Sequence, residues 1–177
     1  MLFPISSIML KNALISASPF IVSVPFTTSG LTKFDEFDEF EPKAAWQPPG
    51  YIFAIVWPLL YTLLFSMNWN ILQVSTTLIS SFKSIIARDT LIESSLQGLW
   101  LWNFRYKPEI SGRTPSQYFT GFASMMSLVG FSMYRLVRFW RNPMSWKYVW
   151  MYIPYAIWIS FASFLNLQLL LGIVKIE

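Results

Sequence analysis

The chain alternates between long stretches without charged residues and short charged segments. Residues 44–82, 114–134 and 148–174 contain no Asp, Glu, Lys or Arg. A helix that crosses the hydrocarbon core of a bilayer needs about 20 mostly apolar residues. Each uncharged stretch is therefore long enough for one crossing, but too short for two crossings and a turn.

Two further segments are less regular. Residues 5–26 are apolar but contain Lys11 and Asn12. They fit either a helix whose lysine snorkels or faces the bundle, or a removable targeting peptide. A signal peptide carries its charge before its apolar region, so we favour the helix. Residues 88–105 are short and contain Glu93, and a buried or re-entrant helix fits them as well as a crossing.

This pattern predicts an all-α integral membrane protein, a single domain of residues 1–177 folded as a bundle of five transmembrane helices. The helices are expected at residues 5–26, 50–73, 88–105, 116–140 and 147–172, with a polar loop at 27–47.

Composition supports a membrane protein. Hydrophobic residues make up 54% of the 177 residues and charged residues 12%, whereas soluble domains carry about 25% charged residues. Aromatic residues reach 19%, with nine Trp, which suits the membrane interface. The net charge is +4, but the basic residues are thinly spread beside apolar runs, so we expect headgroup contacts and not nucleic-acid binding. One such boundary is bracketed by Arg135, Arg138, Arg141 and Lys147.

The chain has no Cys and no His. This excludes disulfides, a Ser-His-Asp triad, a Cys nucleophile, and zinc or haem sites that need these ligands. We therefore expect no catalytic residue, no metal and no cofactor. The acidic run at residues 34–41 fits a docking site for a basic partner or a solvated loop, and we favour the loop. Basic residues nearly balance on the two sides of a five-helix arrangement, so orientation stays open.

Two motifs resemble a known family. Residues 46–61 read WQPPGYIFAIVWPLLY, and residues 153–166 read IPYAIWISFASFLN. They are similar to the second and fifth helices of the translocator protein / tryptophan-rich sensory protein (TspO/MBR) family, also called the peripheral-type benzodiazepine receptor family. In the third helix Glu93 stands where the family has Gln, and Gln97 where it has Asn, followed by Trp100. Phe65 replaces a usual Gly, and the family's proposed cholesterol motif lacks its Tyr after Asn166.

Spacing alone leaves each candidate site residue open to two interpretations. Phe53, Trp57 and Tyr61 are four residues apart, so they form one stripe that either lines a pocket or faces lipid. Trp158 and Ala162 share a face that either leaves space for a ligand or packs closely on a neighbouring helix. Glu93 is either an anchor in the bundle interior or a solvated residue at the interface, but an acid buried in a membrane favours the interior.

The resemblance implies a receptor or transporter that binds porphyrins such as protoporphyrin IX, or other flat hydrophobic molecules such as sterols, within the bundle. Alternatives are a light-dependent porphyrin-degrading enzyme and an interaction protein that acts through the acidic first loop. Expected partners are the lipid bilayer and a porphyrin or sterol-like molecule, and a homodimer is left open. The resemblance points to the mitochondrial outer membrane in a eukaryote or the cell envelope in a bacterium. The candidate ligand-binding residues are Trp46, Pro48, Pro49, Phe53, Trp57, Tyr61, Glu93, Gln97, Trp100, Trp158, Ala162 and Asn166.

Overall fold

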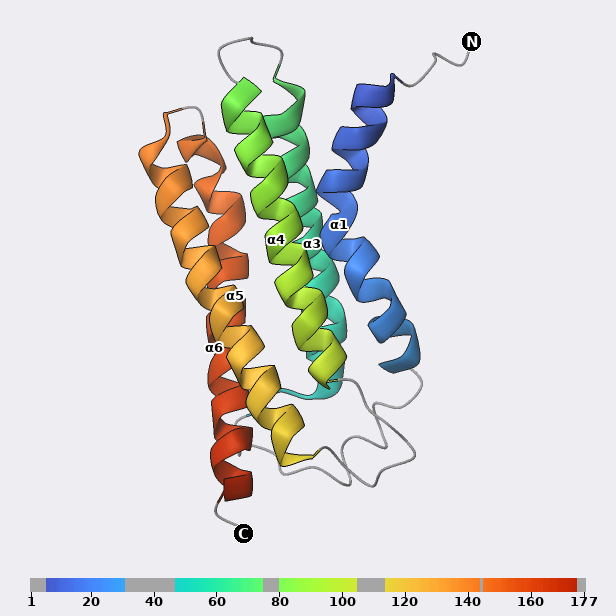
Figure 1. Ribbon diagram of the computed structural model, residues 1–177, viewed down its shortest axis with the longest axis vertical. Helices are drawn as coiled ribbons and strands as arrows, with labels where there is room; N and C mark the ends of the chain where they lie inside the picture. The colour runs from blue at the N-terminus through green and yellow to red at the C-terminus, as the bar shows by residue number, and fades with distance from the viewer. Residues whose placement is uncertain (1–5, 31–46, 75–79, 105–113, 144, 175–177) are drawn as a thin grey trace.

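Five long helices lie side by side in one bundle (Figure 1). The computed structural model describes residues 6–30, 47–74, 80–104, 114–143 and 145–174, and this part of the chain contains no strand. The elements are α1 (Ser7–Gly30), α3 (Gly50–Gln73), α4 (Ser80–Phe104), α5 (Pro115–Arg141), the short 3-10 helix η2 (Trp146–Tyr148) and α6 (Val149–Val174).

Local sequence signals explain where α3 and α5 begin. The tandem prolines end directly before α3, where the Ile52 N–H donates to the Pro49 carbonyl at 3.0 Å. At α5 the Thr114 hydroxyl accepts from the backbone N–H of Gln117, and the Gln117 side chain accepts from the backbone N–H of Thr114. Pro115 takes the first helical position. This capping box satisfies two amide groups that the helix itself leaves unpaired.

Helix α4 packs against α1, α3 and α5, while α6 packs against α3 and α5. The close approach of α1 to α4 depends on small residues. The hydroxyls of Ser18 and Ser94 lie 2.8 Å apart, and a Cβ atom at Gly98 would clash with Cγ1 of Val22. Small residues at such crossings let two backbones approach closely in a membrane.

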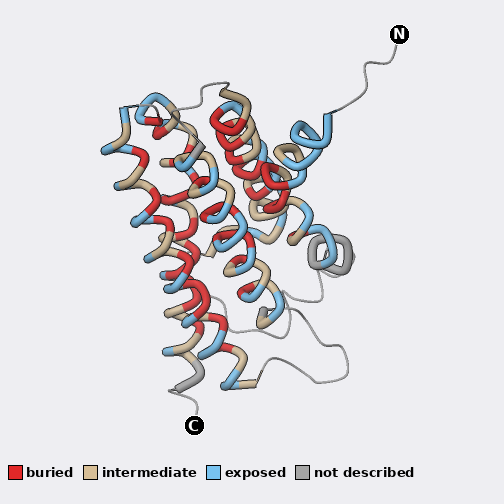
Figure 2. The backbone as a smooth tube through the Cα atoms, turned by 45° about the horizontal axis from the view of Figure 1, so that its top comes forward, coloured by how far each residue is buried: buried red, intermediate tan, exposed pale blue. Residues whose placement is uncertain are grey.

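The outside of the bundle is unusually apolar, and its largely apolar core also holds charged groups. The outward faces of the helices are largely exposed and the facing sides are buried (Figure 2). Large apolar side chains stand outside, such as Trp150 at 67% exposed and Phe119 at 61%. Charged and amide side chains are buried inside, including Glu93, Gln97 and Arg135. A lipid environment accounts for both observations.

Three segments are long and apolar enough to cross a membrane, Ser7–Pro25, Gly50–Gln73 and Trp146–Gly172. Helices α4 and α5 are long enough, but they are not apolar enough to count as spans by composition. Four charged residues lie in α4, and α5 combines three arginines with several Ser, Thr and Gln residues. The structure thus bears out the all-helical membrane bundle, with three candidate spans by composition.

The observed helix bounds differ from the expected ones mainly at two places. The third helix begins at Ser80 and not at residue 88, because the segment 80–87, which contains Lys83, forms its first turns. Helix α1 continues to Gly30, through Pro25, so residues 27–30 do not belong to the expected polar loop. The rest of that loop up to residue 46 lies outside the described residues.

Candidate functional site

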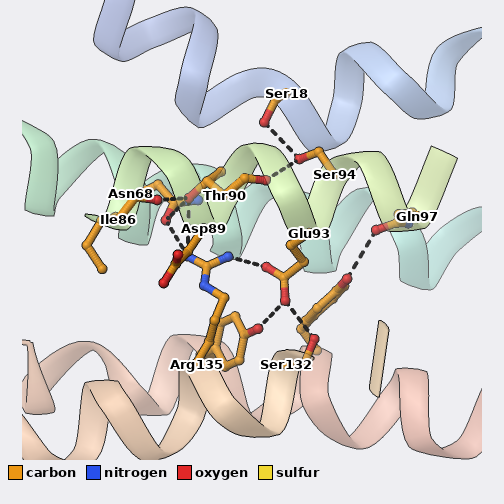
Figure 3. Close-up of polar contacts among 12 residues, drawn as sticks. Ser18, Asn68, Ile86, Asp89, Thr90, Glu93, Ser94, Gln97, Ser132 and Arg135 are labelled. Atoms are coloured by element: carbon orange, nitrogen blue, oxygen red, sulfur yellow. Dashed lines mark hydrogen bonds and ion pairs between the residues drawn. The ribbon is translucent and has the colours of Figure 1, made fainter. Parts of the chain in front are cut away.

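A carboxylate is buried in the middle of the bundle. Glu93 of α4 is 4% exposed, and its carboxylate accepts hydrogen bonds from the Ser132 hydroxyl at 2.6 Å, from Tyr152 and from Arg135 (Figure 3). The prediction that Glu93 faces the interior is confirmed. Groups from α5 and α6 thus meet one side chain of α4.

Arg135 is the counter-ion, and sequence reasoning missed it. Its guanidinium is 1% exposed and pairs with Glu93. Its Nη2 donates to Thr90 Oγ1 at 3.2 Å and to Asn68 Oδ1 at 3.4 Å. The same group lies 5.3 Å from the ring centroid of Tyr152, within cation–π range. The expectation that Arg135 sits among headgroups is therefore wrong. Its guanidinium is buried and contacts groups of α3, α4 and α6.

A second ion pair lies one helical turn nearer the bundle end. Asp89 of α4 is 1% exposed and pairs with Arg138 of α5 and with Arg88 beside it. Asp89 and Glu93 are four residues apart, and Arg138 and Arg135 are three apart in the opposite chain direction. The acids of α4 and the arginines of α5 consequently form a double ion pair across one antiparallel interface.

One turn beyond Glu93 along α4, Gln97 joins three helices. Its amide Nε2 donates to the Tyr61 hydroxyl of α3, and its Oε1 accepts from the Tyr155 hydroxyl of α6 at 3.2 Å. Further along, Trp100 Nε1 donates to Asn166 Oδ1 at 3.1 Å. The side chains of Gln97 and Asn166 are therefore part of the bundle's internal polar network.

Directly beside this network lies an aromatic cluster centred on Trp57. Its ring centroid is 5.5 Å from Tyr61, 5.7 Å from Trp100 and 6.4 Å from Trp158. Phe53 lies 5.3 Å from Trp158. These separations are typical of tilted and edge-to-face aromatic pairs. We call these five residues, contributed by α3, α4 and α6, the aromatic cluster.

Two further features of the cluster lie on α6. Within the described part of the chain, the buried Nε1–H of Trp158 has no hydrogen-bond acceptor. Ala162 lies one turn from Trp158 on α6 and is 2% exposed. An indole N–H can only donate, so its buried donor is available to an acceptor atom of a bound molecule.

Other predicted site residues are not brought into the cluster. Trp46 lies outside the described residues. Pro48 is half-buried and Pro49 exposed at the start of α3. Further along the α3 stripe, Phe65 and Trp69 stack on each other, with ring centroids 6.1 Å apart.

The rings of the aromatic cluster lie in contact range of one another, with centroids 5.3–6.4 Å apart. A groove of about 390 Å³ lies on the outer face of α4. Its lining residues come from α4 alone, and they are Arg88, Leu91, Ile92, Ser95, Leu96 and Leu99.

Sequence reasoning also missed Tyr152 and Tyr155 as parts of the network. Their signal was available, because two tyrosines three residues apart share one helical face, and a buried hydroxyl needs a partner. Asn68 lies seven residues after Tyr61, two turns along the same face of α3. A polar residue at that position was a candidate partner for a buried charge.

Comparison with known proteins bears on the whole bundle. The sequence model of the TspO/MBR family matches residues 14–171, nearly the whole chain. No curated protein and no solved structure matches the chain significantly. The matched region includes the aromatic cluster and both buried ion pairs. The chain therefore belongs to the TspO/MBR family and is an integral, multi-pass membrane protein.

Proposed function

We propose that this protein binds porphyrins such as protoporphyrin IX, or other flat hydrophobic molecules such as sterols, at the aromatic cluster. Membership of the family supports a membrane protein of the sterol- and porphyrin-binding kind in general. The observation that carries the specific proposal is the grouping of three tryptophans around one point between α3, α4 and α6, with a buried indole N–H lacking an acceptor.

The chemistry of the cluster suits a flat apolar ring. Aromatic pairs add about 0.5–1.5 kcal/mol beyond the burial of their surface, and a planar ligand can replace one ring contact by another. An unsatisfied buried donor costs roughly 1–3 kcal/mol. A ligand oxygen or nitrogen that accepts from Trp158 Nε1 would recover part of this cost, so the cluster favours a ligand with an acceptor on an apolar body.

Access from the membrane side fits the burial of the cluster. Trp57 and Tyr61 are buried, whereas Phe53 and Trp158 are only half-buried. Phe53 and Trp158 therefore form the lipid-facing side of the cluster, between α3 and α6. Because the rings contact one another, a ligand must turn them aside to bind, and the small side chain of Ala162, one turn from Trp158 on α6, obstructs that movement less than a larger residue would.

The polar network next to the cluster has a positioning role in this proposal. Tyr61 is held by Gln97, and Gln97 in turn by Tyr155. Trp100 is held by Asn166. Fixing one edge of each ring leaves its apolar face toward the cluster, so the same contacts that join the helices preset the binding surface.

We further infer that all five helices cross the bilayer. The charges that make α4 and α5 poor spans on composition lie largely on their common interface, as Asp89–Arg138 and Glu93–Arg135. The exposed positions of α5 are mostly apolar, such as Val137 at 49%, and those of α4 include Leu91, Leu99 and Trp102 at 47–53%. Buried pairing removes most of the cost of placing charges in hydrocarbon, so these two helices can cross together.

Purified protein titrated with protoporphyrin IX tests the function. We expect saturable binding, read from the porphyrin absorption band. Trp158→Ala should weaken binding by about 2 kcal/mol, roughly 30-fold in Kd, the scale of an aromatic hot spot. Trp69→Ala is the matched control on α3 and should change Kd little. Equal affinity of the wild type and Trp158→Ala would contradict the proposed site. Illumination that consumes porphyrin with turnover would indicate the enzymatic alternative.

A further inference from the structure

Apart from the Glu93–Arg135 pair inside the bundle, the charges of the described residues gather at one end of it. This end holds the start of α1, the end of α3, the start of α4, the end of α5 and the start of α6 (Figure 1). A hydrogen bond from Asn12 to the Leu72 carbonyl and the Arg138–Asp89 ion pair connect these segments. The described charged residues are Lys11, Lys83, Arg88, Asp89, Glu93, Arg135, Arg138, Arg141 and Lys147.

Pairing leaves this end strongly positive. Glu93 and Arg135 neutralise each other inside the bundle. Six basic residues then remain against the single carboxylate of Asp89, which is buried, so the end carries a net charge of about +5. Arg141 and Lys147 are exposed on the two sides of the turn between α5 and α6. Their positive charge faces outward.

The same turn exposes three indole rings. Trp140 is 66% exposed, Trp146 57% and Trp150 67%. Trp146 lies in η2 and Trp150 in the first turn of α6. Tryptophan prefers the level of the headgroups, where its ring meets acyl chains and its N–H meets water. A soluble anion would match the cations but would leave these rings exposed to water.

Hydrogen bonds fix the turn that carries these groups. Ser145 is fully buried, and its hydroxyl donates to the Phe139 carbonyl at 3.2 Å. The backbone N–H groups of Ser145 and Trp146 both donate to the Asn142 carbonyl at 3.0 Å. Arg141 and Lys147 therefore flank a turn that hydrogen bonds hold in one conformation before α6.

We propose that this turn is a binding surface for acidic phospholipids, with Arg141 and Lys147 on the phosphate groups and Trp140, Trp146 and Trp150 at the headgroup level. Charge complementarity selects an acidic over a zwitterionic lipid, and the exposed rings select a lipid over a soluble phosphate. This surface lies at the end of the bundle and is separate from the aromatic cluster.

Native mass spectrometry of the full chain tests this, using mixed micelles with equal phosphatidylglycerol and phosphatidylcholine. The wild type should retain phosphatidylglycerol preferentially. Arg141→Gln with Lys147→Gln should lower that preference by about fivefold per charge, up to roughly 30-fold. Lys11→Gln with Lys83→Gln removes equal charge from the same end and should change it much less. The helix content measured by circular dichroism shows whether each variant is folded.

Two results would overturn the proposal. An equal loss in both double variants would mean that net charge, and not this turn, selects the lipid. Displacement of phosphatidylglycerol by glycerol phosphate at similar concentration would identify a soluble-anion site. Trp146→Ser with the charges intact adds an independent readout, since it should reduce retention of both lipids while leaving the preference between them.

Discussion

Glu93 is the residue in which charge, burial and helix packing meet. It accepts from Ser132 and Arg135 of α5 and from Tyr152 of α6. Placing a charged side chain at the centre of a bilayer costs roughly 2.5 kcal/mol or more unless a partner is present. Here three partners surround the carboxylate, so the charge stabilises the bundle only as long as the set remains complete.

We predict that Glu93→Gln lowers the free energy of unfolding by about 3 kcal/mol, because Arg135 stays charged and buried without its counter-ion. Ser95→Ala, an exposed position on the same helix, should change stability by no more than about 0.5 kcal/mol. Denaturant unfolding in mild detergent, followed by circular dichroism, measures both. A Glu93→Gln protein as stable as the wild type would show that the ion pair is dispensable.

The interior position of Glu93 could be predicted from the sequence, whereas that of Arg135 could not. A single acid within an apolar segment must face away from lipid, and this argument needs no partner. Arg135 lies three residues before Arg138 and six before Arg141, a spacing that also fits a boundary cluster. Only the packing of α5 on α4 distinguishes the buried arginine from the two that follow it.

Helices α4 and α5 act as a pair. Their interface holds Asp89–Arg138 and Glu93–Arg135, and near its other end Asn103 donates to the Ser124 hydroxyl at 3.3 Å. Polar contacts thus run along much of the interface between the two helices. Each helix thus supplies the counter-ions that neutralise the buried charges of the other.

Exchanging the charges tests this pairing. Glu93→Arg or Arg135→Glu alone should abolish recovery of folded protein, since each places two like charges together. The double exchange should restore a measurable part of it. Glu93→Arg with Arg138→Glu is the mismatched control, one turn out of register, and should recover nothing. Size-exclusion chromatography after detergent extraction gives the folded fraction. Equal recovery of both double variants would refute specific pairing between α4 and α5.

The bounds of these helices show where hydropathy stops being informative. Residues 80–87 belong to α4 although they lie outside the apolar segment. A helix continues as long as its backbone can hydrogen-bond, and it does not end where the bilayer ends. The start of α5 carries local start signals in Thr114, Pro115 and Gln117, which hydropathy does not register.

At the scale of the whole molecule, the five helices run alternately up and down. Ser7 and Val174, the outer ends of α1 and α6, lie at opposite ends of the bundle (Figure 1). With five crossings, tags at the amino and carboxyl termini should therefore lie on opposite sides of sealed vesicles. Protease protection measures this, with permeabilised vesicles as the control. Two tags protected together would rule out five crossings.

The bundle and its family could be predicted from two motifs and the hydropathy pattern, but the form of the aromatic cluster could not. Four-residue spacing places Trp57 and Tyr61 on one face of α3 without saying whether they meet lipid or one another. Their contacts with Trp100 and Trp158 depend on how three helices pack.

The most direct test of the proposed site is porphyrin binding by Ala162→Phe. Ala162 is buried beside Trp158, so a phenyl ring there would occupy the space a ligand needs. Ala123→Phe, on the exposed face of α5, is the control for an added ring. Titration with protoporphyrin IX, followed by tryptophan fluorescence, should show wild-type affinity for Ala123→Phe and a loss of roughly tenfold or more for Ala162→Phe. Wild-type affinity in a folded Ala162→Phe protein would contradict binding at the aromatic cluster.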